Sequence, residues 1–182
     1  MDTKKLLVIS DSHGKVRALQ DVFEWANERI PPKDTICAVA FCGDGISDLK
    51  LAAETTGFYS DWNYVRGNND HTHQVPETAV FDFANHRFYL CHGHRYSLYG
   101  DHHTLVAAAR RSQANAALFG HTHSPYQKTE EGIFLLNPGS VARSRSRIGE
   151  TFAVIVCTEG QPLKAEFFGI GERGEINKIE IN

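Results

Sequence analysis

Five short strings of polar residues each follow directly on a run of apolar residues, and they carry side chains of the kinds that bind metal ions. The strings are Asp11-Ser12-His13, Gly43-Asp44, Gly67-Asn68-Asn69-Asp70, His92-Gly93-His94 and Gly120-His121-Thr122-His123. Together they offer two or three carboxylates, an amide oxygen and four or five imidazoles. Mixed oxygen and imidazole ligation without thiolates suits Mn²⁺, Fe, Zn²⁺, Ni²⁺ or Co²⁺, and it suits Ca²⁺ less well. The high share of histidine, ten in 182 residues, also indicates a metal site.

The position of these strings predicts that they meet in space. In open α/β sheets, sites form where the carboxyl ends of the strands converge, so residues more than a hundred positions apart can share one site. At a strand end, residues i and i+2 point to the same face, which lets Asp-x-His or His-x-His present two ligands together. The glycines allow the backbone to turn sharply beside them. One such string is weak evidence, but five in order are strong.

The elements needed to position the strings can be read from the hydrophobic pattern. Short apolar runs at residues 6–10, 36–42 and 63–66 predict strands. Apolar residues at spacings of three and four over 16–30 predict an amphipathic helix that is stopped by Pro31-Pro32, and a second helix is expected at 48–56. Strands that alternate with helices indicate a parallel sheet built from right-handed crossovers.

After residue 78 the pattern changes to strands with few helices. Hairpins are expected at 80–83 with 87–91, at 126–129 with 133–136, and at 151–158 with 163–168. A helix at 102–113, a strand at 116–119 and a polar tail from 169 that forms an edge strand or frays complete the pattern. We therefore predict a second sheet packed against the first, in one α/β sandwich domain that spans residues 1–182.

Composition limits the partners and the compartment. A net charge of −3 and a pI near 6.3 provide no global positive field for broad nucleic-acid binding. No apolar stretch approaches 18 residues and no signal-peptide cleavage site is present, so we expect no membrane contact and a cytoplasmic location. The four cysteines lie singly in apolar runs, which favours buried free thiols. A small phosphoester is the expected partner, and self-association is left open.

The ordered series D-x-H, G-D, G-N-x-D, H-G-H and G-H-T-H resembles the calcineurin-like metallophosphoesterase superfamily over residues 5–145 or so. The chain length, with N-P-G-S at 137–140, is most similar to its small prokaryotic phosphodiesterase branch. The resemblance implies a four-layer α/β/β/α sandwich with two packed mixed sheets and a two-metal site at the strand ends. By similarity, the first ion would be held by Asp11, His13 and His123, the second by Asn68, His92 and His121, and both by a bridging Asp44.

Such a site would hydrolyse a phosphoester, first of all a phosphodiester, by in-line attack of a metal-bridging hydroxide. Two divalent ions about 3.5–4 Å apart can lower the pKa of a water molecule and neutralise the phosphoryl oxygens. Dications at that distance repel each other strongly unless an anion lies between them, and Asp44 would supply that anion. Mn²⁺ is expected first, with Ni²⁺, Co²⁺, Zn²⁺, Fe or Mg²⁺ as alternatives.

Several residues beside the ligands have competing interpretations. Asp11 alone could cap a helix, and Asp44-Gly45 alone could form an ordinary turn. We expect Asp70 to support catalysis by orienting an imidazole, and His94 to line the site rather than bind an ion. Asn69 occupies the position where the superfamily often has a histidine that is thought to protonate the leaving group. An amide cannot supply that proton.

Two further alternatives concern the basic residues and the function. The guanidinium groups of Arg143 or Arg145 could bind substrate phosphate, although a loop with this charge is usually solvated. The rival function is a protein-binding scaffold, as in the metallophosphoesterase-like subunit of retromer, because fold alone does not determine function. Competent ligand types at all seven positions favour an enzyme. A nuclease would need a basic groove or a capping domain, and the sequence indicates neither.

Overall fold

Two β-sheets packed face to face form the centre of the protein. The computed structural model describes residues 3–28 and 36–181. The first sheet has the order β11-β10-β9-β1-β2-β3, formed by Thr3–Ile9 (β1), Ile36–Phe41 (β2), Asp61–Tyr64 (β3), Glu150–Thr158 (β9), Lys164–Ile170 (β10) and Ile176–Ile179 (β11). The second has the order β4-β5-β6-β8-β7, formed by Thr78–Phe83 (β4), His86–Cys91 (β5), Ala116–Leu118 (β6), Pro125–Glu130 (β7) and Ile133–Pro138 (β8).

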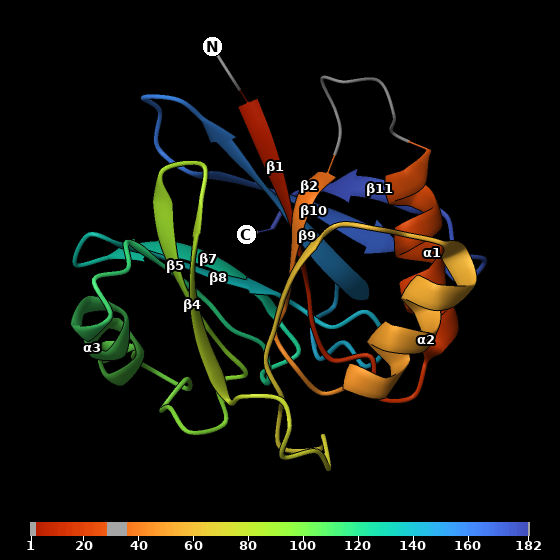
Figure 1. The fold of residues 1–182 in the computed structure, drawn as a ribbon, viewed down its shortest axis with the longest axis horizontal. Helices are drawn as coiled ribbons and strands as arrows, with labels where there is room; N and C mark the ends of the chain where they lie inside the picture. Colours follow the sequence, from red (N-terminus) through yellow and green to blue (C-terminus); the bar gives the residue numbers. More distant parts are fainter. Residues whose placement is uncertain (1–2, 29–35, 182) are drawn as a thin grey trace.

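Helices cover the outer faces of both sheets. Val16–Asn27 (α1) and Ile46–Thr56 (α2) lie on the first sheet, and His103–Arg111 (α3) lies on the second (Figure 1). Both sheets contain parallel and antiparallel pairs. The predicted four-layer α/β/β/α sandwich of two mixed sheets is therefore confirmed.

Successive side chains of strand β1 point to opposite faces of the first sheet, so the strand contributes to two hydrophobic cores. Leu7 and Ile9 pack toward α1 and α2, whereas Leu6 and Val8 pack into the core between the two sheets. All four are fully buried, because a strand in the middle of a sandwich has no solvent-facing side. This packing fixes the direction in which β1 delivers the polar residues that follow it.

The helices match the predicted amphipathic pattern, with small differences at their ends. Helix α1 buries Leu19, Val22, Phe23 and Ala26, and it ends at Asn27 rather than at residue 30. The predicted stop at Pro31-Pro32 lies outside the described residues. Helix α3 packs Leu105, Val106 and Ala109, among others, against the outer face of the second sheet.

Other differences from the sequence-based prediction are small. Strand β3 ends at Tyr64, two residues before the expected end at 66, and the tail does form a strand, β11, paired with β10 at the edge of the first sheet. Cys42, Cys91 and Cys157 are buried free thiols as predicted, but Cys37 is only half-buried.

Candidate metal centre

The polar strings meet because strands β1, β2 and β3 are parallel neighbours in one sheet, as are β5 and β6 in the other. Backbone hydrogen bonds continue past the strand ends. Asp11 N–H donates to Gly43 O at 3.0 Å, and Gly120 N–H donates to His92 O at 2.9 Å. The two sheets therefore bring their strand-end loops to one edge of the sandwich.

The backbone at the candidate ligands is unusual. Nine residues other than glycine have a positive φ among those described, and five of them are predicted ligands: Asp11, His13, Asp44, His121 and His123, with φ between 45° and 65°. The left-handed region is uncommon for such residues and is kept only where the surroundings hold it. Here it turns the backbone at the strand ends and directs these side chains into the space between the sheets.

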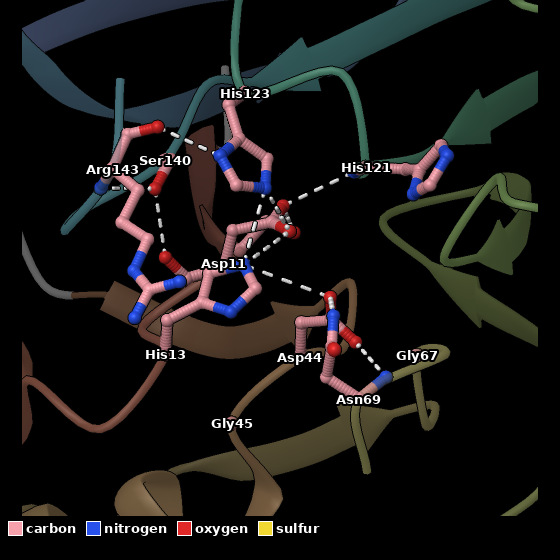
Figure 2. Close-up of polar contacts among 12 residues, drawn as sticks. Asp11, His13, Asp44, Gly45, Gly67, Asn69, His121, His123, Ser140 and Arg143 are labelled. Carbon is pink, nitrogen blue, oxygen red and sulfur yellow. Dashed lines mark hydrogen bonds and ion pairs between the residues drawn. The ribbon is translucent and has the colours of Figure 1, made fainter. Parts of the chain in front are cut away.

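The first cluster consists of Asp11, His13 and His123. Asp11 Oδ1 lies 3.1 Å from His123 Nε2 and 3.5 Å from His13 Nε2, and the two Nε2 atoms lie 3.1 Å apart. Figure 2 shows the two imidazoles converging on the carboxylate from different loops. These three ligand atoms are close enough to share one cation.

The second cluster consists of Asp11, Asp44 and His92. His92 Nε2 lies 3.3 Å from Asp44 Oδ2 and 3.9 Å from Asp11 Oδ1. Asp44 Oδ2 also lies 3.6 Å from His13 Nε2, in the first cluster. Each carboxylate therefore faces imidazoles on both sides, and Asp11 is common to the two clusters.

The site passes a test of fit for divalent cations. Asp11 Oδ1 and His92 Nε2 are buried, yet neither makes a hydrogen bond of good geometry within the described part of the chain. Buried polar atoms normally have a partner. The other ring nitrogens are held in place, because His92 Nδ1 contacts Cys42 O at 2.8 Å and His123 Nδ1 contacts Arg143 O at 2.7 Å. This arrangement leaves Nε2 free as a ligand, as in many metal sites.

The electrostatics suit cation binding. Burial tends to raise the pKa values of Asp11 and Asp44, but the neighbouring imidazoles outweigh it and hold both below the ordinary value for aspartate. For His94 and His121, burial and then the charge of His92 lower the pKa. Burial disfavours the charged form of His92, but its contact with Asp44 and the charge of Asp11 outweigh burial and raise its pKa, and the contact with Asp11 raises the pKa of His123. The carboxylates therefore favour positive charge at these imidazoles, and a bound cation would take the place of their protons.

Asp70 has a different role from the one predicted. Its Oδ2 accepts hydrogen bonds from the N–H groups of Asp44 and Gly67, both at 2.8 Å, and its Oδ1 accepts from Gly45 and Ile46, both at 2.9 Å. The expectation that it orients an imidazole is therefore wrong. Asp70 instead caps the N-terminus of α2, where Gly45 has no capping side chain, and ties the Asp44 turn to the loop after β3.

The two asparagines of the third string occupy different environments. Asn69 N–H donates to Asp44 Oδ1 at 2.8 Å, and its side-chain Nδ2 donates to Asp44 Oδ2 at 2.6 Å (Figure 2). Asn68, the predicted ligand, is exposed. The ligand role of Asn68 stays a prediction, while Asn69 is the amide that contacts Asp44.

His121 and His94 lie on the His92 side of the site. The His121 ring centroid is 5.2 Å from that of His92, and the His94 centroid is 5.5 Å from His92 and 6.3 Å from His121. His121 N–H also donates to Asp11 Oδ2 at 3.1 Å. His94 Nδ1 is buried without a hydrogen-bond partner in the described chain. Both rings therefore border the second cluster, although neither belongs to the tight groups above.

Sequence analysis missed three residues that hold the ligand loops in place. Asp48 accepts hydrogen bonds from Ser12 Oγ at 2.6 Å and Gly14 N–H at 2.7 Å. Buried Ser140 donates to Asp11 O at 2.7 Å, and buried Asn137 donates to Gly120 O at 2.7 Å. The sequence indicated Asn137 and Ser140 only as part of the N-P-G-S string, which supported the family resemblance but predicted no role for either residue.

Two of the glycines in the strings are required by close approach. A Cβ on Gly67 would lie 2.1 Å from Asp44 Oδ1, and one on Gly120 would lie 2.0 Å from Ser10 Oγ and 2.6 Å from Asp11 Oδ2. Any side chain at either position would displace a candidate ligand.

Residues 5–160 match the model of the calcineurin-like phosphoesterase superfamily domain. The chain belongs to this superfamily. It is 27% identical to the probable metallophosphoesterase YsnB of Bacillus subtilis over 153 residues, which are 82% of each chain. Membership implies divalent metal ions as cofactors, and the clusters around Asp11 supply candidate ligands for them.

Solved structures of the same fold include a predicted phosphoesterase and Vps29 proteins. A predicted phosphoesterase from Streptococcus pneumoniae superposes with a TM-score of 0.76 at 24% identity, covering 98% of both chains. Vps29 from Entamoeba histolytica, complexed with Zn²⁺, superposes with a TM-score of 0.74 at 22% identity, covering 97% of this chain and 98% of the other. At these identities the likeness establishes the fold. Among the described residues, no helix is long and apolar enough to cross a membrane.

Proposed function

We propose that the chain is a binuclear metal-dependent phosphodiesterase. The proposal rests on the two carboxylates, Asp11 and Asp44, each of which faces imidazoles on two sides. Two buried ligand atoms of this group, Asp11 Oδ1 and His92 Nε2, also lack hydrogen bonds among the described residues. Asp11, His13 and His123 would hold one divalent ion, and Asp44 and His92 the other, with His121 and Asn68 as its further ligands. Mn²⁺ is the ion we expect to serve best, because the donors are oxygen and imidazole.

When bound, two such ions would supply an acidified water molecule and neutralise the charge of the phosphoryl group. The protein's own groups then orient and bind. The carbonyl oxygens of Cys42 and Arg143 fix the ring orientations of His92 and His123, so that Nε2 faces the site. Arg143 belongs to the loop that holds His123 (Figure 2), and its exposed guanidinium is positioned to pair with a phosphate oxygen.

Proton supply to the leaving group is the step at which this site departs from the superfamily pattern. Asn69 contacts Asp44 but carries an amide, which cannot act as an acid at neutral pH. His94 is the alternative donor that we propose, because its buried Nδ1 has no hydrogen-bond partner in the described chain and its ring borders His92 and His121. We therefore assign it a proton-donating or substrate-orienting role without a metal bond.

The second candidate function is a protein-binding scaffold, favoured by the structural likeness to Vps29. The two functions predict different results with bis(p-nitrophenyl) phosphate, assayed after loading with Mn²⁺, Ni²⁺, Co²⁺, Zn²⁺ or Mg²⁺. The enzyme should bind two ions per chain and hydrolyse the diester, and Asp11→Asn should abolish both properties. Asp61→Asn, which alters an exposed carboxylate on β3, should change neither. Stoichiometric metal binding without hydrolysis of any diester would favour the scaffold.

A further inference from the structure

A cavity of about 480 Å³ adjoins the candidate metal centre. Part of its wall is Thr122, which lies between His121 and His123 in the sequence. Another part is Leu98, which packs on the H-G-H string: a Cβ on Gly93 would lie 2.7 Å from Leu98 Cδ1. The cavity is therefore in contact with the string Gly120–His123, and through Leu98 with the string His92–His94, and its volume is in the range of small-molecule sites.

One side of the cavity is a packed group of aromatic rings. The ring centroids of His102 and Tyr126 are 4.7 Å apart, and those of His102 and Phe119 are 5.6 Å apart. The Tyr126 hydroxyl donates to Glu130 Oε1 at 2.8 Å, so its polar end already has a partner. The ring is held in place against His102, and it lines the cavity where an aromatic ligand could contact it.

Tyr99 and Arg145 line another part of the same cavity. Tyr99 is 71% exposed, which is unusual for an aromatic ring beside a site, and Arg145 Nη1 donates to its hydroxyl at 3.4 Å. The backbone N–H of Arg145 also donates to His123 O at 2.9 Å, so the backbone of this arginine is joined to the loop that carries a candidate ligand. The cavity thus has both a guanidinium group and aromatic rings on its lining.

We propose that this cavity binds a planar aromatic substituent of the phosphoester, a nucleoside, with Tyr99 and Tyr126 contacting the base and Arg145 the phosphate. The inference rests on the proposed function, because it names the substrate class of the same site. Bases stack on aromatic side chains, and guanidinium groups pair with phosphate oxygens. Ser124, Lys128 and Glu130 on the lining add donors and acceptors that a base edge could use, which a purely hydrocarbon substituent would leave unpaired.

The cavity on the other side of the metal centre is less suited to this role. It begins at Gly14 and Lys15 and measures about 770 Å³, but Asp21, Glu150 and Glu172 are among its lining residues. Its two cations, Lys15 and Arg17, already pair with Glu150 at 4.0 Å and with Asp21 at 2.7 Å, so the lining keeps a net negative charge that disfavours an anionic substrate. The cavity beside Tyr99 has one carboxylate, Glu130, against Lys128 and Arg145.

Binding to the full chain, with and without Mn²⁺, tests the proposal without requiring turnover. Isothermal titration calorimetry would compare adenosine 5′-monophosphate, ribose 5-phosphate and phenyl phosphate. The nucleotide should bind at least about 10-fold more tightly than either of the others, which corresponds to about 1.4 kcal/mol. Tyr99→Ala should reduce the ratio of nucleotide to ribose 5-phosphate affinity toward one, and Tyr99→Phe should keep it. Arg145→Ala should weaken both phosphates by a similar factor.

Two control variants match these changes. Tyr59→Ala removes a tyrosine that is 91% exposed and lies outside the cavity, and Arg147→Ala removes an exposed arginine of the same loop. Both should bind all three ligands like the natural protein. Equal affinity for the nucleotide and ribose 5-phosphate, or a ratio that survives Tyr99→Ala, would overturn the proposal. Phenyl phosphate binding as tightly as the nucleotide would overturn the nucleoside assignment.

The outcome can be separated from that of the proposed function. Diester hydrolysis by a protein that does not distinguish the nucleotide from ribose 5-phosphate would refute the subsite and leave the phosphodiesterase. Base-dependent binding by a protein that hydrolyses no diester with any metal would support the subsite and refute the phosphodiesterase.

Discussion

Replacing Asp70 with asparagine should destabilise the protein and weaken metal binding, although Asp70 contacts the backbone of Asp44 and not its carboxylate. Its two oxygens accept from four backbone N–H groups in the turns that carry Asp44 and Gly67. An asparagine has one acceptor oxygen, so in either orientation its NH₂ group faces two N–H donors. Two bonds to a charged acceptor are lost, and the helix α2 N-terminus loses its nearby negative charge.

The size of the effect follows from the number of bonds. A hydrogen bond to a charged group contributes about 1.5–3 kcal/mol, and since Asp70 is half-buried we take the lower end, about 3 kcal/mol for two bonds. For a chain of this length, 1 kcal/mol shifts Tm by about 2–4 °C, so Asp70→Asn should lower Tm by about 6–12 °C. Because Asp70 holds the backbone of Asp44, metal affinity should fall about 10–100-fold, as for other groups that orient ligands.

Differential scanning calorimetry of the metal-free protein and titration with Mn²⁺ provide the two measurements. Asp101→Asn is the matched control, because Asp101 is exposed and, among the described residues, accepts a hydrogen bond from the His103 N–H group alone, at 3.2 Å, at the start of α3. It should lower stability by about 1 kcal/mol or less and leave the metal affinity unchanged. If Asp70→Asn lowers Tm no further than Asp101→Asn, the four-bond cap does not stabilise the Asp44 turn and the reasoning fails.

Three further outcomes follow from the site. Asp44→Ala should reduce the metal content of both clusters, because Asp44 Oδ2 faces both His13 and His92. If elemental analysis of this variant finds two ions per chain and turnover is near normal, the proposed bridging role of Asp44 is wrong. His94→Ala should lower turnover while two ions stay bound, whereas loss of an ion would make His94 a ligand. With Asn69 in place of an acid, a Brønsted series of diesters should show a steep dependence on leaving-group pKa, and Asn69→His should help alkyl esters more than aryl ones. General acid assistance is worth about 10²–10⁴-fold, and a shallow slope in the natural protein would show that another group already supplies the proton.

The hydrophobic pattern was sufficient to predict the fold class, and the polar strings predicted which kinds of side chain gather at the strand ends. Apolar residues that recur with a period of two or of 3.6 predict strands and helices, because they show which face of an element must be buried. This information lies within a short stretch of sequence and does not depend on the rest of the fold. The polar strings were recognisable for the same reason: a strand that is apolar throughout and then ends in Asp-x-His or His-x-His has few structural explanations. Asp11, His13, His92 and His123 could therefore be predicted as neighbours before any coordinates were available.

Only the tertiary structure decided how these groups are arranged. Asn69, rather than Asn68, contacts Asp44, and Asp70 faces the backbone rather than an imidazole. Both outcomes depend on the conformation of a turn, and a hydrophobic pattern does not specify the directions of side chains in a turn. The position of Asp11 in both clusters depends on how two sheets pack, since His13 and His123 lie 110 residues apart. Asp48 and Ser140 carry no chemical signal in the sequence, because a carboxylate or hydroxyl that holds a loop resembles any solvated one until the loop is placed beside it.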